Sequence, residues 1–238
     1  MKPKQILSPK LDVVFQSIFG EVGSEDITKS FLENILNEHI DSVDLSRNPI
    51  LRREFVNDKL GILDIVAKIN DDYFCNIEMQ CASKDEIIER ILYYWARSYS
   101  NQLTAGKNYN LLHKSISILI ADFTLKSLKD LPYHTSWKII EENFRTTILT
   151  DKLQIHIIEL PKILKLQNEN DELLDWLFFL VNPKSARVVE KMKTNKALKQ
   201  AIEKLEKISQ DEKMQRIAEL RLKAILDENS ARYDGFKE

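Results

Sequence analysis

Residues 63–80 read LDIVAKINDDYFCNIEMQ, and this stretch decides the fold. Apolar side chains alternate with others over residues 62–69, and the cluster NDD at residues 70–72 separates this run from a second one over residues 73–80. Alternation is typical of β-strands, and Asn and Asp are typical of tight turns. The stretch therefore predicts a β-hairpin.

A turn symmetric about Asp71 would fix the register of this hairpin. Val66 would then face Asn76, and Asp64 would face Glu78, with opposed Cβ atoms roughly 4.5–5.5 Å apart. Opposed like charges destabilise a sheet, so a fold that keeps them usually places a cation between them. Carboxylate oxygens are ligands that suit Mg²⁺ or Mn²⁺. The alternative is that both acids simply face solvent, and a register slip of one residue would send them to opposite faces.

A helix is expected after the hairpin, because Ser83 to Glu86 matches a capping box and Gly106 is a natural end. Helical spacing predicts one polar stripe, formed by Arg90, Tyr94, Arg97 and Asn101. Arginines and a tyrosine beside paired carboxylates suit the binding of a phosphodiester. The alternative is an ordinary amphipathic helix, whose buried side would comprise Ile91, Leu92, Trp95, Tyr99 and Leu103.

The rest of the chain supplies further helices and strands around this centre. Helices are expected over residues 9–20 and 24–38 and throughout the chain beyond 168, and strands over 43–46, 50–56, 115–123, 133–148 and 152–160. This order predicts an α/β core with a helical C-terminal part. We expect a core of residues 1–165 and a helical region of residues 166–238 packed on it or extending from it.

Composition narrows the class of protein. The 238 residues carry a formal net charge of −2 and are 43% hydrophobic, so the chain can bury a core and is not basic as a whole. Cys75 and Cys81 are interpreted as reduced thiols, which indicates a reducing compartment. The sequence shows no signal peptide and no apolar run of roughly 20 residues, so we expect a cytoplasmic protein without membrane spans. Residues 184–223 hold twelve Lys or Arg against six Asp or Glu, a local excess of +6 that could contact phosphates.

Three stretches together resemble a known family: LSPKLDVVFQSIFG (residues 7–20), LDIVAKINDDYFCNIEMQ (63–80) and ERILYYWARSYSNQLTAGKNY (89–109). They are similar to the PD-(D/E)XK nuclease superfamily, and within it to the recombination-promoting nucleases and PD-(D/E)XK family transposases. The resemblance covers roughly residues 5 to 190. It implies a restriction-endonuclease-like αβββαβ core with a mixed central sheet.

The resemblance also implies roles for individual residues. Asp64 and Glu78 would ligate the divalent metal, with the backbone carbonyl of Met79 as a third ligand. Gln80 stands where the superfamily usually has lysine, although E-x-Q is common in this branch. Arg90 and Tyr94 resemble a Gln-x-x-x-Tyr helix motif, with arginine in place of glutamine.

Two further residues are candidates with open alternatives. Lys59 could supply the missing cation, but strand parity points it to the other face unless the chain bulges. Asp12 could be an outer metal ligand or an acid, or a plain surface residue.

Gln80 can orient a water but cannot act as a general base near neutral pH.

The function that the resemblance implies is a Mg²⁺- or Mn²⁺-dependent DNA endonuclease, which hydrolyses phosphodiester bonds in recombination or transposition. Arg90, with Arg97 as a further candidate, would neutralise charge on the phosphate. The alternatives are an inactive nuclease-fold DNA-binding module and a helical oligomerisation protein. Apolar residues along the C-terminal helices could form a homodimer seam.

Overall fold

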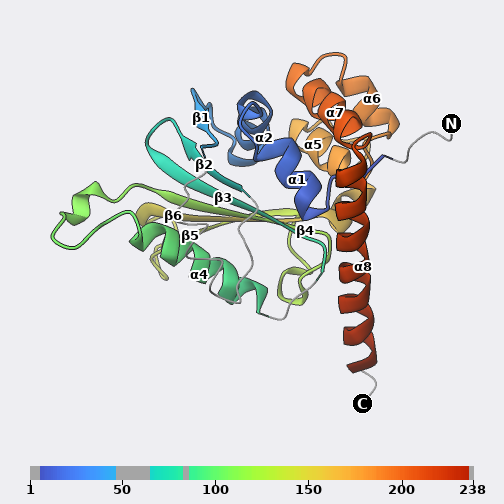
Figure 1. Ribbon diagram of the computed structural model, residues 1–238. Helices are drawn as coiled ribbons and strands as arrows, with labels where there is room; N and C mark the ends of the chain where they lie inside the picture. The colour runs from blue at the N-terminus through green and yellow to red at the C-terminus, as the bar shows by residue number, and fades with distance from the viewer. Residues whose placement is uncertain (1–5, 47–64, 83–85, 236–238) are drawn as a thin grey trace.

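A computed structural model describes residues 6–46, 65–82 and 86–235, in which a mixed sheet lies between two unequal helical layers (Figure 1). The strands are β1 (Val43–Asp44), β2 (Ile65–Ile69), β3 (Tyr73–Gln80), β4 (Ser115–Ala121), β5 (His134–Ile140) and β6 (Ile148–Glu159). Their order is β1-β2-β3-β4-β6-β5. The β3–β4 and β4–β6 pairs are parallel and the other pairs are antiparallel, so the predicted α/β class with a mixed sheet is confirmed.

The β2–β3 hairpin has the predicted register wherever both of its strands are described. Ile69 pairs with Tyr73, and Val66 pairs with Asn76. Asn70 and Asp71 form the turn with φ of 52° and 54°, a left-handed conformation that Asn and Asp tolerate better than most residues. The predicted pairing of Asp64 with Glu78 lies outside the described residues.

One face of the sheet is covered by helices from both ends of the chain (Figure 1). These are α1 (Asp12–Phe19), α2 (Glu25–Leu36), α5 (Glu172–Val181), α6 (Ala186–Lys191) and α7 (Lys196–Ile208). The first helix starts at Asp12 and not at Pro9, and Leu11 is its N-cap residue. It ends at Gly20 as predicted, where a Cβ would come within 3.0 Å of Ile65 Cγ1, so a close approach of helix to strand requires glycine.

The other face is covered by α4 (Ile87–Ser100), which packs mainly on β4 (Figure 1). The helix is shorter than predicted, because it ends at Ser100 and Gly106 lies in a later turn; the expected cap at Ser83 lies outside the described residues. Its buried residues are Ile87, Ile91, Tyr94 and Ser98, which recur at helical spacing. Leu92, expected on the buried side, is exposed, because the face of the helix that meets the sheet is rotated toward Tyr94 and Ser98.

The last helix, α8 (Glu212–Gly235), contacts α1 with its first half and then runs beyond the body of the protein (Figure 1). One hydrophobic core includes residues from both sides of position 165, among them Phe19, Phe31 and Trp176, whose rings lie 4.9 to 5.9 Å apart. The predicted division at residue 165 stays a prediction. None of the described helices is long and apolar enough to cross a membrane.

The strand predicted over residues 133–148 is wrong in one respect. The chain forms β5 as far as Ile140, turns over residues 141–147, and returns as β6 from Ile148. The turn was missed because EENFRTT contains neither glycine nor proline. Three short 3₁₀ helices, η1 (Tyr109–Leu111), η2 (Lys126–Leu128) and η3 (Leu160–Lys165), complete the described elements.

Candidate active site

Glu78 is a buried carboxylate on β3, on the face of the sheet that α4 covers. Alternate residues of β3 point to opposite faces, and Ile77 and Met79 belong to the main core on the far side. Leu119, the β4 neighbour of Glu78, packs instead with Ile87 of α4. The strand thus places the carboxylate between sheet and helix, where it is only 5% exposed.

Two side chains hold this carboxylate at the same oxygen. An Nη2 of Arg90 forms an ion pair with Glu78 Oε1, and Gln80 Nε2 donates a hydrogen bond of 2.8 Å to that oxygen. The side chains of the ion pair are 14% and 6% exposed, so solvent screens their charges weakly. The structure therefore brings together three of the predicted site residues, Glu78, Gln80 and Arg90.

Tyr94 joins the same cluster from the next turn of α4. Its ring lies 5.7 Å from the guanidinium carbon of Arg90, within the range of a cation–π contact. Tyr94 is 1% exposed and so faces the sheet, not solvent. Arg97 is partly buried and donates a 3.2 Å hydrogen bond to the Tyr93 hydroxyl, so the predicted polar stripe divides into a buried pair and a more peripheral arginine.

Several buried polar atoms on the same side of the sheet as the carboxylate lack a hydrogen-bond partner within the described part of the chain. Among the described residues, neither Asn76 Oδ1 nor Nδ2 has a hydrogen-bond partner, and the same holds for Ser117 Oγ and Arg90 Nε. Asn76 and Ser117 are register neighbours on β3 and β4, two residues before Glu78 and on its face. A buried polar atom without a partner costs roughly 1–3 kcal/mol, so this concentration favours a site that receives water or a hydrated ion.

The oxygen atoms of Glu78, Asn76 and Ser117 are of the kind that a divalent cation binds. A buried carboxylate, a carboxamide oxygen and a hydroxyl are hard oxygen donors, the type that Mg²⁺ and Mn²⁺ prefer, directly or through bound water. The side chains of Glu78, Asn76 and Ser117 therefore fit such an ion. Among the described residues, no three His, Cys, Asp or Glu side chains group closely enough to hold a metal, and the predicted ligand Asp64 is not among them.

An ion pair that the sequence did not reveal lies at the end of β3. Lys10 Nζ is 2.6 Å from Asp122 Oδ2, and the backbone N–H of Asp122 donates to the carbonyl of Gln80 at 2.8 Å. Cys81 donates its thiol hydrogen to the carbonyl of Lys10 at 3.0 Å. Since 112 positions separate Lys10 from Asp122, no local pattern could predict the pair. Lys59, the cation considered from sequence, lies outside the described residues.

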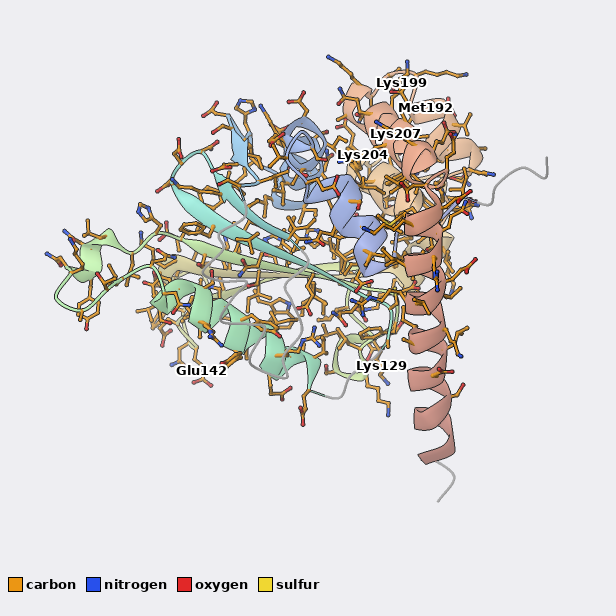
Figure 2. All side chains as sticks on the ribbon, viewed as in Figure 1. Lys129, Glu142, Met192, Lys199, Lys204 and Lys207 are labelled. Atoms are coloured by element: carbon orange, nitrogen blue, oxygen red, sulfur yellow. The ribbon has the colours of Figure 1, made fainter. Side chains whose placement is uncertain are left out.

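Asp12 and the basic C-terminal helices also have defined partners. Asp12 pairs with Arg221 of α8 at 3.2 Å. Arg187 donates to Asp175 at 2.6 Å and to three backbone carbonyls, and Lys204 donates to Ser24 Oγ at 2.6 Å. Part of the excess positive charge of residues 184–223 is therefore paired or hydrogen-bonded inside the protein. Figure 2 shows Lys199, Lys204 and Lys207 on these helices, on the far side of the sheet from α4.

The mixed six-stranded sheet with helices on both faces is consistent with a restriction-endonuclease-like α/β fold. The family model of PD-(D/E)XK nuclease family transposases matches residues 9–234, which is nearly the whole chain. The chain therefore belongs to the PD-(D/E)XK nuclease family transposases. No curated protein and no solved structure matches it.

Proposed function

We propose that the protein is a divalent-metal-dependent endonuclease that hydrolyses DNA phosphodiester bonds in recombination or transposition. The observation that carries the proposal is the buried carboxylate of Glu78, held at one oxygen by Arg90 and Gln80. Membership of the nuclease family supports the reaction class and DNA as substrate. The metal site is supported by family membership and by the oxygens of Asn76 and Ser117 on the face of Glu78, which have no partner among the described residues, since Arg90 already balances the Glu78 charge.

Asp64, Glu78 and the carbonyl of Met79 are the proposed ligands of Mg²⁺ or Mn²⁺. Asp64 directly precedes β2 in the sequence, and the confirmed hairpin register is the one from which its pairing with Glu78 was predicted. When bound, the cation supplies Lewis-acid stabilisation of the phosphate and lowers the pKa of a coordinated water. Asn76 and Ser117 can hold the surrounding water in place through their unsatisfied atoms.

Arg90, Gln80 and Tyr94 have separate tasks in this proposal. Arg90 balances the Glu78 carboxylate in the resting protein and neutralises charge that develops on the scissile phosphate. Gln80 is a neutral amide, so it orients the attacking water and takes no proton from it. Because Tyr94 is buried against the sheet, we assign it the support of the ligating carboxylates and not a contact with DNA.

DNA is expected to lie along the edge of the sheet where β3 and β4 end. Lys10 and Asp122 lie at this edge beside Gln80, and Lys10 would have to exchange its ion pair with Asp122 for a phosphate to bind it there. Arg97 on α4 adds a positive charge on this side of the sheet, whereas the lysines of residues 184–223 that Figure 2 labels lie on the far side from α4. Binding of this kind weakens steeply as salt rises.

A second candidate function is an inactive DNA-binding module with the same fold. The observation in its favour is that Gln80, in place of the usual lysine, donates to Glu78 and so helps Arg90 to satisfy that carboxylate without a metal. In this case the protein would bind DNA equally well in the presence of Mg²⁺ or of a chelator. A homodimer through the C-terminal helices remains a separate proposal.

Nicking of supercoiled plasmid separates the two functions. The wild-type protein should nick DNA with Mg²⁺ or Mn²⁺ and not with EDTA, and Glu78→Gln should abolish nicking while DNA binding persists. Glu89→Gln is the matched control, because Glu89 is an exposed acid on α4 outside the cluster. Nicking by Glu78→Gln at the wild-type rate would refute the proposed site. Metal-independent DNA binding without nicking by the wild type would favour the inactive module.

A further inference from the structure

Residues 136–152 of the β5–β6 hairpin, which we call the arm, reach past the rest of the sheet except at Ser136 and Trp137, which pair with the part of β6 beside β4. Strand β6 pairs with β4 only over Leu153–Glu159. The outer residues of β6 therefore have only β5 as a strand partner among the described strands. A two-stranded hairpin is marginally stable in water by itself, so we expect the arm to be stabilised by packing against another surface.

The arm is unusually apolar for an exposed segment. Every residue from 136 to 149 is exposed. Phe144 is 71% and Leu149 is 76% exposed. The other large apolar side chains of the arm are also exposed, namely Trp137, Ile139, Ile140 and Ile148. Because apolar residues on both strands face water, the arm is not one face of a covered layer but a free apolar projection.

An apolar hollow of about 250 Å³ lies between α4 and the inner part of the β5–β6 hairpin. Trp137 belongs both to the arm and to the wall of this hollow. The rest of the lining comes from α4, η2 and β6: Ile88, Ile91, Leu92, Ser127, Leu128, Ile155 and Ile157. One chain thus carries an apolar projection and, beside it, an apolar hollow.

The exposed area is close to what a stable dimer needs. The six apolar side chains of the arm and Leu92 expose on the order of 700 Å² together, if each contributes about 100 Å². This area is divided between the two faces of the hairpin, because consecutive strand residues such as Ile148 and Leu149 point to opposite sides. Each partner of a standard protein interface buries roughly 800 Å², so only an interface that encloses both faces of the arm would approach that size.

The charges of the arm favour a second copy over nucleic acid. Three basic residues, Lys138, Arg145 and Lys152, are balanced by three acids, Glu141, Glu142 and Asp151. A neutral surface offers no net attraction to phosphates. Interspersed charges of both signs allow two identical surfaces to meet around a two-fold axis with opposite charges adjacent.

The tip of the arm lies away from the candidate active site, whereas the hollow lies level with that site, because Ile157 pairs with Leu119 and Leu119 pairs with Glu78. The register places the arm beyond the N-terminal end of β4, whereas Gln80 and Asp122 lie at the opposite end of the parallel strands. In Figure 2, Glu142 at the tip of the arm lies on the α4 side of the molecule, away from the helical layer. Helix α8 is a weaker candidate for an interface, because among its exposed leucines only Leu222 and Leu226, about 40° apart around the helix, share one face.

We propose that the arm is a homodimer interface in which the arm of each copy packs on the arm and the Trp137 hollow of the other. Such an interface is isologous, since projection and hollow come from the same chain and satisfy each other reciprocally. Phe144 and Leu149 are the expected anchors, because they are the most exposed apolar residues of the arm.

Light scattering after size-exclusion chromatography of the full chain tests this interface. The wild type should have twice the subunit mass of 27.8 kDa. Phe144→Asp combined with Leu149→Asp should weaken self-association about 100-fold or more, and unfolding is not expected because both side chains face water. Leu220→Asp with Leu226→Asp on α8 is the matched control, with similarly exposed leucines, and should remain dimeric.

Three results would overturn the proposal. The first is a wild-type protein that stays monomeric at micromolar concentration, which would indicate that the arm binds a different protein. The second is a dimer that the α8 variant dissociates while the arm variant does not. The third is an arm variant that keeps its mass and loses DNA binding, which would make the arm a DNA contact. Plasmid nicking is measured separately, so a failure of the nuclease proposal leaves this test intact.

Discussion

Arg90 of α4 forms an ion pair with Glu78 of β3 in the space between helix and sheet, and both side chains are largely withdrawn from water. This contact explains how the fold keeps a carboxylate inside. It also identifies the arginine that lies nearest to the proposed metal ligand.

Loss of one partner of this ion pair should destabilise the protein more than loss of both. Arg90→Met leaves the Glu78 charge buried without its cation and should cost roughly 3–5 kcal/mol of unfolding free energy. The double variant Glu78→Leu with Arg90→Met should recover most of that loss. Urea unfolding of the two single variants and the double variant measures the coupling. Additive effects would show that the ion pair contributes little.

Asn76→Leu should separate metal binding from folding. The substitution removes two unsatisfied polar atoms from a buried position, so thermal stability should stay unchanged or rise. If Asn76 supports the water around a metal held by Glu78, the affinity for Mn²⁺ should fall by about 10–100-fold. Calorimetric titration with Mn²⁺ and thermal melting of one preparation give both values. A variant that is more stable and binds Mn²⁺ normally would show that Asn76 has no part in the site.

Replacement of Gln80 tests its proposed task as a positioning residue. Gln80→Met removes the donor to Glu78 Oε1 and should slow nicking by about 10–100-fold, with DNA binding retained. Gln80→Lys restores the residue usual in the superfamily and should keep or raise activity. The salt dependence of binding serves as the control, since Gln80→Met changes no charge. Equal rates for wild type and Gln80→Met would remove Gln80 from the mechanism.

Acid should destabilise the protein through His156, a buried histidine of β6. Burial, with smaller contributions from His134 and nearby lysines, lowers the pKa of His156 from 6.5 to about 3. The neutral ring contacts His134 Nε2 at 2.8 Å through Nδ1 and the Gln154 amide at 2.7 Å through Nε2, and protonation would disrupt this chain. Below pH 6.5 the unfolded chain binds a proton that the folded protein excludes, so stability is complete above that pH and falls as pH decreases toward 3.

The size of this effect is at most about 1.4 kcal/mol per pH unit, the slope for one proton. His156→Gln should flatten the dependence of the urea midpoint on pH between about 6 and 4. His39→Gln, at an exposed histidine, is the control and should leave the slope unchanged. A wild-type midpoint that is constant over this range would contradict the expected titration.

The sequence by itself determined the hairpin and much of the site. Alternation and the turn at Asn70 and Asp71 set the register of β2 and β3, because strand pairing across a short turn depends on neighbours in the chain. Glu78 became a candidate from that local pattern, Gln80 from the family resemblance, and Arg90 and Tyr94 from helical spacing together with that resemblance. Helix ends were less well predicted, because capping residues compete with tertiary contacts.

Only the tertiary structure decided which side chains meet. The parallel pairing of β3 with β4 puts Asn76 beside Ser117 across forty-one positions, and the docking of α4 brings Arg90 onto Glu78. The contact of Lys10 with Asp122 and the exposure of the arm depend in the same way on segments far apart in the chain. Local sequence fixes backbone angles and the spacing of side chains, whereas burial and long-range pairing depend on how distant elements pack together, which no short window of sequence contains.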